Sequence, residues 1–286
     1  MDELLSKYLE VNEIKLIKYN LNREKQRTIY INNEYFIKIG KNTDELFFNN
    51  LMKEIELYRE NKENSNLPKL VDYFISNNIC IIIQERINGK TLGNVRNNFN
   101  LNLDKSLRLK IANSVLEIAN MSLKINLKDD YNTKEKIDKY IIKASSYLDD
   151  KIIQQINNNY ERIIAENEDK VIAHGDLIST NIILDNEKIY FIDWEFISLK
   201  PRYYDLAYFL LFSKEYNSLD ILQDLDNINV ESVYKEAILI CLKEISNNAK
   251  LAGKIDNSII EKNINRWKKE LCLLLNDKNV LYSGRK

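Results

Sequence analysis

Three side chains with oxygen donors lie within one short stretch in the middle of the chain, VIAHGDLISTNIILDNEKIYFIDW, from Val171 to Trp194. They are Asp176, Asn181 and Asp193. Carboxylate and amide oxygens can hold Mg²⁺, which keeps several waters and binds substrate phosphates. A carboxylate that holds no metal can act as a base toward a hydroxyl nucleophile. The stretch is therefore predicted to be the catalytic and metal-binding centre of a phosphoryl transferase.

The order of apolar and polar residues predicts how this stretch folds. A short strand over Lys170–Ala173 leads into a loop, and Asn181 opens a second strand. A turn at Asp185 leads to a third strand that ends at Asp193. Because the second and third strands form a hairpin, the start of one lies beside the end of the other. Asn181 and Asp193 are therefore expected to face each other.

A lysine in the N-terminal part of the chain could hold phosphate groups. Lys38 lies in a strand-like run, Tyr35–Ile39 (YFIKI), and the helix predicted over Asp44–Glu63 carries Glu54. A strand lysine followed by a helix glutamate is the arrangement by which kinases position nucleotide phosphates. Taken alone, the pattern also fits a lysine on the solvated face of an edge strand.

The elements that must position these residues fall into two groups. Alternating or β-branched runs predict strands over Glu13–Tyr19, Arg27–Ile31, Tyr35–Ile39, Leu70–Ile75 and Ile79–Gln84, after a short helix over Met1–Val11. The last of these strands is almost entirely apolar, as is typical of a central, buried strand. Helical periodicity begins at Leu103 and continues over Thr133–Tyr147, Asp150–Glu166, Tyr204–Phe212, Val230–Asn248 and Ser258–Asn276. We expect an α+β protein with a small antiparallel N-lobe, residues 1–86, and a larger, mainly helical C-lobe, residues 87–286.

Composition and charge exclude several classes of function. Of the 286 residues, 44% are hydrophobic and 30% are charged, which is ordinary for a globular protein. The 42 basic and 43 acidic residues give a net charge of −1, so nucleic acid is not an expected partner. No window approaches the ~18 apolar residues of a membrane span, and the first residues, MDELLSKYLE, lack the pattern of a secretion signal. A cytoplasmic protein without a membrane partner is expected.

Several motifs, in order along the chain, carry a resemblance to a known group of enzymes. HGDLISTN at His174–Asn181 has the form H-G-D-x-x-x-x-N, FIDWE follows at Phe191–Glu195, and PRYYDLAYFL follows at Pro201–Leu210. Together with Lys38 and Glu54, these motifs resemble those of the aminoglycoside phosphotransferase and choline kinase family of small-molecule kinases. The resemblance spans roughly residues 10 to 212. It implies the two-lobed protein-kinase-like fold and transfer of a phosphoryl group from ATP or GTP to an alcohol.

The resemblance implies a role for each matched residue. Asp176 would orient or deprotonate the acceptor hydroxyl, and Asn181 and Asp193 would hold Mg²⁺ against the nucleotide phosphates. Lys38 would contact the α- and β-phosphates, and Glu54 would pair with Lys38.

Supporting roles follow in the same way. His174 would brace the catalytic loop by hydrogen bonding, and Asp205 would anchor the backbone of that loop from the start of a helix. The linker after Ile79–Gln84 includes Glu85 and Ile87, whose backbone groups could pair with the edge of the nucleotide base. One departure is the polar segment Asn20–Gln26, which has no glycine where the nucleotide loop is expected.

The sequence says less about the acceptor than about the reaction. The acceptor is expected to be a small alcohol, with cationic ones among the candidates, and the protein to be a monomer or a dimer. A polycationic aminoglycoside would favour acidic residues, and the run that offers them contains Asp220, Asp224, Asp226 and Glu231. Choline would favour an aromatic cage, for which the candidates are Trp194, Tyr203, Tyr204 and Trp267, and Glu195 could contact a cation in either case.

Other classes of function stay open. The protein could be a choline or ethanolamine kinase, or a catalytically inactive nucleotide-binding regulatory protein. The intact set of Lys38, Asp176, Asn181 and Asp193 argues against an inactive protein. A protein kinase is disfavoured because IDWE stands where protein kinases have D-F-G.

Overall fold

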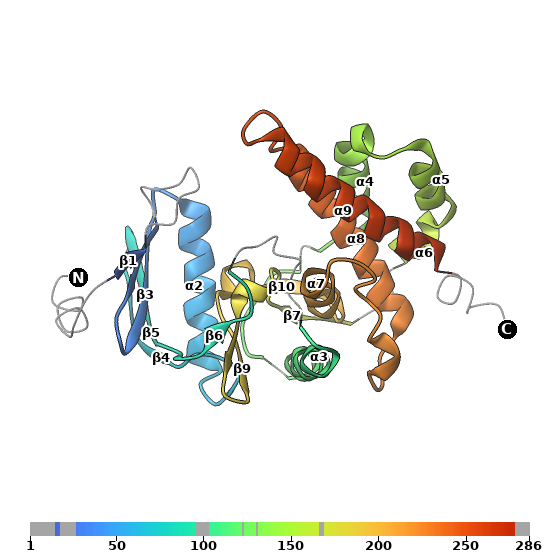
Figure 1. Ribbon diagram of the computed structural model, residues 1–286. Coiled ribbons are helices and arrows are strands. Elements are labelled where there is room, and N and C mark those ends of the chain that lie inside the picture. Colours follow the sequence, from blue (N-terminus) through green and yellow to red (C-terminus); the bar gives the residue numbers. More distant parts are fainter. Residues whose placement is uncertain are drawn as a thin grey trace.

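The computed structural model of the chain (Figure 1) describes residues 15–17, 27–94, 103–121, 123–129, 131–165 and 169–277. The helix predicted over Met1–Val11 and the polar segment Asn20–Gln26 lie outside the described residues. The architecture is α+β, with an antiparallel sheet in the N-terminal part and a mainly helical part after it, as predicted.

The N-terminal part is built on a five-stranded antiparallel sheet with the order β1-β2-β3-β5-β4. Its strands are β1 (Lys15–Ile17), β2 (Arg27–Ile31), β3 (Tyr35–Lys41), β4 (Leu70–Ile75) and β5 (Ile79–Glu85). The tight turn between β2 and β3 forms because the Asn32 side chain accepts hydrogen bonds from the backbone N–H groups of Glu34 and Tyr35. The strands predicted over Arg27–Ile31, Tyr35–Ile39, Leu70–Ile75 and Ile79–Gln84 are confirmed, and β1 is the described part of the strand predicted over Glu13–Tyr19. Strand β5 is the buried strand between two neighbours.

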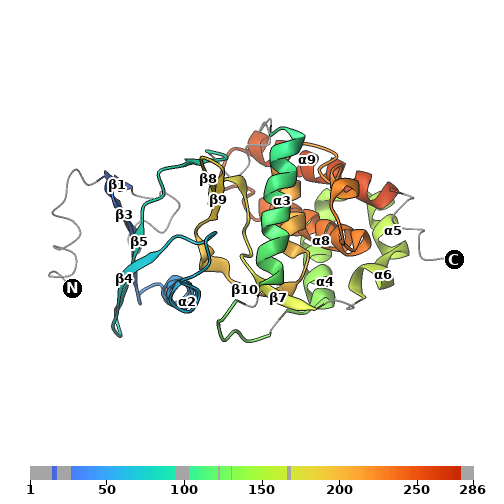
Figure 2. The same ribbon diagram turned by 90° about the horizontal axis from the view of Figure 1, so that it is seen from below.

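The sheet has two apolar faces, and Lys38 is on the one that carries a helix. Helix α2 (Glu45–Glu60) starts at Asp44, whose carboxylate caps it by accepting from the Phe47 N–H. This helix lies along the sheet (Figures 1 and 2), and its Phe47 and Leu51 side chains lie close to Gly40 of β3. Because side chains alternate along a strand, Lys38 is on the same face as Gly40 and points toward α2.

The C-terminal part is mainly helical. Its helices are α3 (Lys105–Asn120), α4 (Thr133–Ala144), α5 (Asp150–Asn158), α6 (Tyr160–Ile164), α7 (Tyr204–Ser213), α8 (Val230–Ala249) and α9 (Asn257–Asn276). All ten residues of α7 are buried, and this helix packs between α3 and α8 at the centre of the part. Helix α9 lies along α8 (Figure 1).

One helix boundary differs from the prediction. The helix expected over Asp150–Glu166 is broken at Asn159 into α5 and α6. The Asn159 backbone N–H donates to Ile156 O, and its side-chain amide donates to Gln155 O, so it ends the first helix by itself. Asparagine favours such local bonds, which compete with continuation of a helix.

Two small sheets carry the central stretch. Strands β6 (Lys90–Thr91), β8 (Ile182–Asp185) and β9 (Lys188–Phe191) form one, and β7 (Lys170–Ala173) and β10 (Ser198–Pro201) form the other. In Figure 2 the β8–β9 hairpin lies between α2 on one side and α3 on the other. The central stretch is therefore sandwiched between the sheet and the helices, with both Lys38 and α7 within reach.

The chain passes from one part to the other through a short crossing between Glu85 and Lys90. Strand β6 pairs with β8 directly afterwards. A Cβ at Gly89 would overlap the backbone carbonyl of Leu184 and the side chain of Ile183. Glycine is required at this crossing because the two backbones approach closely.

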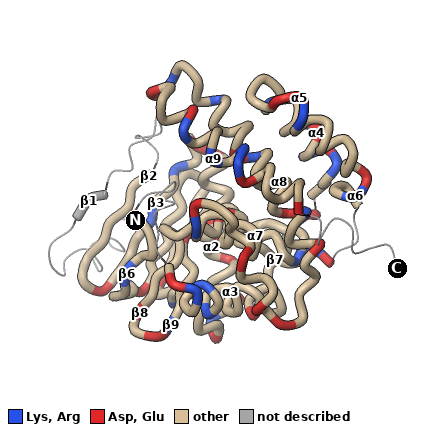
Figure 3. Tube along the Cα trace, turned by 45° about the vertical axis from the view of Figure 1, so that its right-hand side comes forward, with Lys and Arg blue, Asp and Glu red and all other residues tan. Residues whose placement is uncertain are grey.

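Charges of both signs are interspersed over both parts of the protein (Figure 3). This distribution agrees with the net charge of −1. Within the described ranges, no helix combines the length and the apolar character that crossing a membrane requires.

Candidate active site

A buried carboxylate on α7 anchors the loop between β7 and β8. Asp205, in the first turn of α7, accepts hydrogen bonds from the backbone N–H of His174 at 2.6 Å and of Gly175 at 3.0 Å. Burial raises the pKa of this carboxyl, although His174 and the two N–H donors oppose the shift. The loop is thus fixed to the central helix of the C-terminal part.

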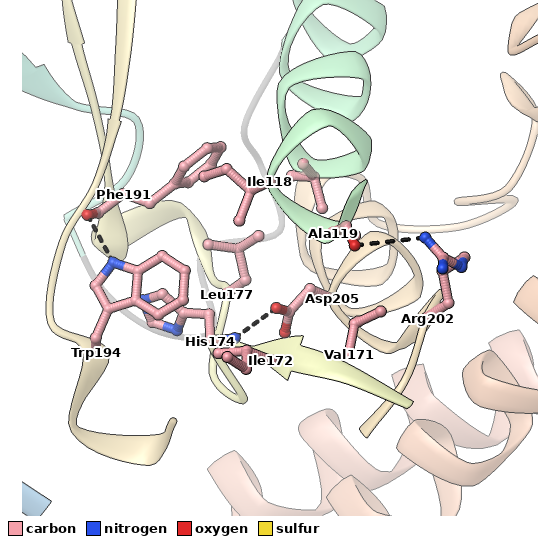
Figure 4. A pocket seen from close by; sticks show the side chains of 11 residues that line it. Ile118, Ala119, Val171, Ile172, His174, Leu177, Phe191, Trp194, Arg202 and Asp205 are labelled. Carbon is pink, nitrogen blue, oxygen red and sulfur yellow. Dashed lines mark hydrogen bonds between the residues drawn. The ribbon is translucent and has the colours of Figure 1, made fainter. Parts of the chain in front are cut away.

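His174 holds the same loop from the other side. Its Nε2 lies 2.8 Å from the carbonyl oxygen of Ile192, and its Nδ1 accepts from the Asp176 N–H at 3.3 Å. This pattern fits the neutral ring with its proton on Nε2. Both ring nitrogens are then engaged with backbone groups, so the ring supports the loop and has no nitrogen left for proton transfer with a substrate. Figure 4 shows the ring packed beside Trp194, with 4.8 Å between the ring centroids.

A small cavity lies behind the loop. Its volume is about 10 Å³, close to the smallest space that holds one water. Figure 4 shows its lining of mainly apolar side chains from α3, β7, β9 and the loop, among them Ile118, Leu177 and Phe191. The cavity is too small for an alcohol or a nucleotide, so it belongs to the support of the loop.

Gly175 allows the sharp bend that precedes Asp176. Its φ of +82° lies in the region that side chains rarely adopt, and a Cβ there would overlap the carbonyl oxygen of Phe196. Gly253, in the turn after α8, has a similar φ of +76° but nothing within 4 Å of the corresponding Cβ position. A side chain at Gly253 would therefore cost only the strained backbone conformation, whereas one at Gly175 would add the cost of the overlap.

Replacing Gly175 by Ala is expected to lower the free energy of unfolding by about 3 kcal/mol or more, because conformational strain and overlap add. Gly253→Ala is the matched control and is expected to cost about 1–2 kcal/mol through the backbone conformation alone. Urea denaturation of both variants measures the difference. Equal losses in the two variants would show that the overlap at Gly175 is relieved without cost.

Asn181 and Asp193 lie side by side at the end of the β8–β9 hairpin. The Ile192 N–H donates to the Asn181 carbonyl at 3.0 Å, which places Asp193 one residue beyond this pair. The Asn181 amide nitrogen donates to the backbone carbonyl of Asp176 at 2.9 Å, so its Oδ1 is directed elsewhere. Asp193 has a left-handed backbone (φ 65°, ψ 56°) and its side chain is 40% exposed. The hairpin thus places the two residues that were predicted to be neighbours at the same end.

Lys38 connects this hairpin to the N-terminal part. Its Nζ lies 3.0 and 2.9 Å from the two carboxylate oxygens of Glu54 and 2.5 Å from Oδ1 of Asp193. Glu54 also accepts a hydrogen bond from the Trp194 N–H at 3.2 Å. Burial by itself would lower the pKa of Lys38, but the carboxylates of Asp193 and Glu54 outweigh burial and raise that pKa. Lys38 is therefore a buried ammonium group held in place by two anions.

Asp176 is half-buried next to a tyrosine that the sequence argument did not identify. The Tyr208 hydroxyl lies 2.9 Å from Oδ1 of Asp176 and 3.2 Å from Oε1 of Glu244 on α8. The apolar pattern of YDLAYFLLF indicates a core helix, and it gives no signal that the hydroxyl of one tyrosine reaches the loop between β7 and β8.

Two lysines near Asp176 were also missed. Lys200 is on β10, and its Cε is 3.3 Å from where a Cβ at Gly175 would lie. Lys243 is on α8, and its Nζ is 3.4 Å from the Tyr208 hydroxyl. A lysine on an amphipathic helix usually marks a solvated face, so the sequence contained no signal for either one.

The surroundings of Lys200 make its charge depend on pH. Burial and the neighbouring ammonium groups of Lys243 and Lys136 lower its pKa to about 8, against the opposing effect of Asp205 and Glu236. Between about pH 8 and the pKa of about 10.4 of a lysine in the unfolded chain, the unfolded state binds more protons than the folded state. The free energy of unfolding is therefore expected to gain a rising contribution over that range.

The measurement is urea denaturation of the wild type and of Lys200→Met between pH 7 and 10. The difference in unfolding free energy between them is expected to shift in favour of the wild type above about pH 8. Lys262→Met, which removes an exposed lysine of α9, should run parallel to the wild type. A constant offset between the wild type and Lys200→Met would contradict the lowered pKa.

The side chains proposed to contact a cationic acceptor have different positions. Trp267 has no exposed surface, because it packs against Phe212 of α7 with 5.0 Å between the ring centroids, so a substrate role for it is wrong. Tyr203 is half-buried, and its hydroxyl accepts from the Asn229 N–H at 3.1 Å. Glu195 is buried close enough to contribute to the raised pKa of Lys38.

Two further aromatic candidates are also buried. Trp194 is 1% exposed, and its indole N–H donates to the Phe191 carbonyl at 2.9 Å (Figure 4). Tyr204 is buried with its hydroxyl 3.1 Å from Nζ of Lys243. Trp194 is therefore part of the core, and Lys243 covers the hydroxyl of Tyr204.

The acidic run after α7 is largely paired with basic side chains of the protein itself. Asp220 lies 2.7 Å from Arg108 of α3 and 2.5 Å from Lys214. Asp224 likewise forms an ion pair with Lys105, and Glu231 forms one with Arg162. These contacts join the segment after α7 to α3 and α6, which accounts for the acidic run without an aminoglycoside.

Glu85 and Ile87 lie at the crossing between the two parts. The Glu85 N–H donates to Lys69 O at 3.0 Å, and the Arg86 N–H donates to Glu34 O at 2.7 Å, so the crossing is tied to the sheet on both sides. Ile87 follows with a half-buried side chain. A role in contacting the nucleotide base stays a prediction for both residues.

The fold and the arrangement of these side chains define a protein-kinase-like phosphotransferase. A family model described as a phosphotransferase enzyme family (APH) matches residues 34–225, which is more than half of the chain. The chain therefore belongs to this phosphotransferase enzyme family, and the resemblance carried by its motifs is confirmed.

Solved structures share the fold over nearly the whole chain. The GDP complex of wild-type aminoglycoside 2'-phosphotransferase-IIIa is 12% identical and has a TM-score of 0.67, covering 94% of this chain and 96% of that one. The choline kinase LicA from Streptococcus pneumoniae is 19% identical with a TM-score of 0.64, covering 95% of this chain and 97% of that one.

A curated relative matches a shorter region. It is the protein LicA homolog of Mycoplasma capricolum subsp. capricolum, which is 27% identical over 126 residues, or 41% of this chain. The match spans half the length of that relative.

Proposed function

We propose that this protein transfers the γ-phosphoryl group of ATP or GTP to a hydroxyl group of a small molecule, as aminoglycoside phosphotransferases do. The observation that carries the proposal is the position of Lys38, which contacts Glu54 of its own part and Asp193 of the other. An ammonium group fixed between two carboxylates at the meeting point of the two parts suits phosphate groups that enter there.

The proposed transfer uses Asp176 as the group that receives the acceptor proton. The acceptor oxygen forms a bond to the γ-phosphorus as the bond from that phosphorus to the β–γ bridging oxygen breaks. The proton of the hydroxyl passes to the Asp176 carboxylate, and the nucleoside diphosphate leaves with the bridging oxygen. Asp176 suits this role because it is half-exposed and its backbone is fixed by His174 and Asn181.

Asn181 and Asp193 would hold Mg²⁺ in this reaction. Their side chains offer an amide and a carboxylate oxygen, which are hard donors of the kind that Mg²⁺ takes in combination with waters and phosphates. The bond from the Asn181 amide nitrogen to Asp176 leaves Oδ1 as the donor atom toward a cation. When bound, Mg²⁺ supplies neutralisation of the charge that develops on the phosphate oxygens.

The nucleotide base is proposed to lie against the crossing at Glu85–Ile87, with the phosphates directed toward Lys38. A solved structure with the same fold is a GDP complex, which supports a nucleotide as the phosphate donor. Consumption of a cellular nucleotide is consistent with a cytoplasmic place of action.

A choline or ethanolamine kinase is the second candidate. It is favoured by the shared fold with the choline kinase LicA and by the clustered rings of Tyr131, Tyr204 and Tyr208, of which neighbouring pairs have centroids 6.3 and 5.7 Å apart. Aromatic clusters of this kind bind quaternary ammonium groups.

The test is a screen for transfer of label from γ-labelled ATP and GTP in the presence of Mg²⁺. The acceptors are aminoglycosides, choline, ethanolamine, methylthioribose and neutral and acidic sugars. Labelling of at least one alcohol by the wild type, and not by Asp176→Asn, is the expected result. Labelling of protein side chains instead, or equal nucleotide hydrolysis by both proteins without any labelled alcohol, would refute the proposal.

A further inference from the structure

Two lysines form the partly exposed layer next to Asp176. Lys243 lies 3.1 Å from the Tyr204 hydroxyl and 3.4 Å from the Tyr208 hydroxyl, which in turn contacts Asp176. Lys200 approaches from β10 on the side of the catalytic loop. The tyrosines beneath are buried, whereas Asp176 and both lysines keep part of their surface exposed. Both lysines are therefore close to the loop that carries Asp176, Lys200 beside Gly175 and Lys243 through the Tyr208 hydroxyl.

Among the described residues, neither ammonium group has a carboxylate in direct contact: Lys200 and Lys243 form no ion pair, and their contacts are with tyrosine hydroxyls and rings. The nearby glutamates of α8, Glu236 and Glu244, are buried and accept from tyrosine hydroxyls. Asp205 and Glu236 act on Lys200 without forming an ion pair with it. Partly buried cations are stabilised when a ligand supplies an anion in direct contact.

The ring faces that could hold a cationic ligand are already in use. Lys200 Nζ lies 4.5 Å from the ring centroid of Tyr204 and 5.2 Å from that of Tyr131. Lys243 Nζ lies 4.7 Å from the ring centroid of Tyr208. These are cation–π distances. A choline-like head group would have to displace the ammonium groups of the chain itself.

We propose that the acceptor alcohol carries an anionic group, a carboxylate or a phosphate, which Lys200 and Lys243 bind while its hydroxyl lies against Asp176. The inference rests on the proposed function, because it assigns a chemical class to the acceptor of that reaction. An anion between the two lysines supplies a counter-charge in direct contact with both, which no carboxylate of the described residues does, whereas a cation there is repelled by both. The expected preference is opposite to that for aminoglycosides or choline.

The lowered pKa of Lys200 supports the same assignment. Burial is its first cause, and the neighbouring cations Lys243 and Lys136 add to it. A bound anion opposes both lysine neighbours and restores the charged form of Lys200.

The test compares alcohols that differ mainly in charge. One series is glucosamine, glucose and glucuronate, and another is choline, glycerol, glycerate and glycerol 3-phosphate. Label transfer gives kcat/KM for the wild type, and calorimetry on Asp176→Asn with Mg²⁺ and a non-hydrolysable ATP analogue gives binding without turnover. In at least one series, an anionic member is expected to bind at least about tenfold more tightly than the cationic member. Glycerate against glycerol 3-phosphate distinguishes a carboxylate from a phosphate ligand.

Lysine variants connect this preference to the proposed residues. Lys243→Met and Lys200→Met are each expected to weaken binding of the preferred anionic probe by about ten- to a hundredfold, with the KM for the nucleotide unchanged. Lys262→Met on the exposed side of α9 is the control, and Lys243→Arg is expected to retain much of the binding because it keeps the charge. Circular dichroism and thermal unfolding exclude loss of fold as the cause.

The outcomes separate this inference from the proposed function. Transfer to choline or glucosamine in preference to the anionic members, or failure of every anionic probe to bind, would overturn the inference and leave phosphoryl transfer intact. Charge-selective binding that depends on Lys200 and Lys243, without transfer to any alcohol, would support the anion site and refute the proposed function.

Discussion

Replacing Asp176 by Asn is expected to lower kcat for phosphoryl transfer by about 10²- to 10⁴-fold, the usual contribution of a general base. The amide keeps the size of the carboxylate and can still contact the Tyr208 hydroxyl, which lies 2.9 Å from Oδ1. It has no basic oxygen to receive the acceptor proton. The KM for the nucleotide should change little, because the phosphate groups are expected at Lys38.

Steady-state transfer assays on purified Asp176→Asn measure this effect, with Glu187→Gln as the control. Glu187 is in the turn between β8 and β9, away from Asp176, and its side chain is 97% exposed, so its charge is removed without disturbing the site. A kcat within threefold of the wild type for Asp176→Asn would show that proton removal is not assisted by this carboxylate.

Asp193→Asn is expected to raise the Mg²⁺ concentration needed for half-maximal activity by at least about 10- to 100-fold, and to lower kcat by about 10²- to 10³-fold. The carboxylate is proposed to hold the metal and lies 2.5 Å from Lys38. Asparagine is the informative substitution because it tolerates the left-handed backbone found at this position better than most residues do. Loss of activity is then due to lost charge and not to a displaced loop.

A titration of Mg²⁺ at saturating nucleotide measures the change, and thermal unfolding confirms the fold. Asp185→Asn, in the turn between β8 and β9, is the matched control, because it removes a carboxylate of the same hairpin away from Lys38. An unchanged Mg²⁺ dependence in Asp193→Asn would place the metal on other ligands.

Much of the fold could be predicted because its local signals agree. The strands β2, β3, β4 and β5 have alternating or continuous apolar patterns bounded by turn residues, and α7 is an apolar run between Pro201 and Lys214. The pairing of Lys38 with Glu54 was implied by the resemblance of the ordered motifs, and the observed contacts between the two side chains agree with it. The side-chain contacts of His174 and Asp205 were expected from the motifs, and the observed hydrogen bonds have that geometry.

What escaped prediction depends on packing between segments that are distant in the chain. Trp267 belongs to the core because α9 lies over α7, which its local sequence does not reveal. Asp220 forms an ion pair with Arg108, which is 112 residues away in the sequence. Lys200 and Lys243 reach the site from a strand and a helix that look like ordinary surface elements in the sequence. The proposed acceptor site, which combines such side chains, is therefore the least predictable part of the protein.

The Lys38–Asp193 contact has a thermodynamic consequence for the order in which ligands enter. It joins the two parts without a nucleotide, so the proposed phosphate site is assembled during folding, and its ordering would not subtract from nucleotide affinity. Free Mg²⁺ at the proposed metal site would, however, have to compete with an ammonium group for an oxygen of Asp193. A metal that arrives with the nucleotide brings phosphate oxygens that give Lys38 another partner. Metal and nucleotide are therefore expected to bind with positive coupling, each one increasing the affinity for the other.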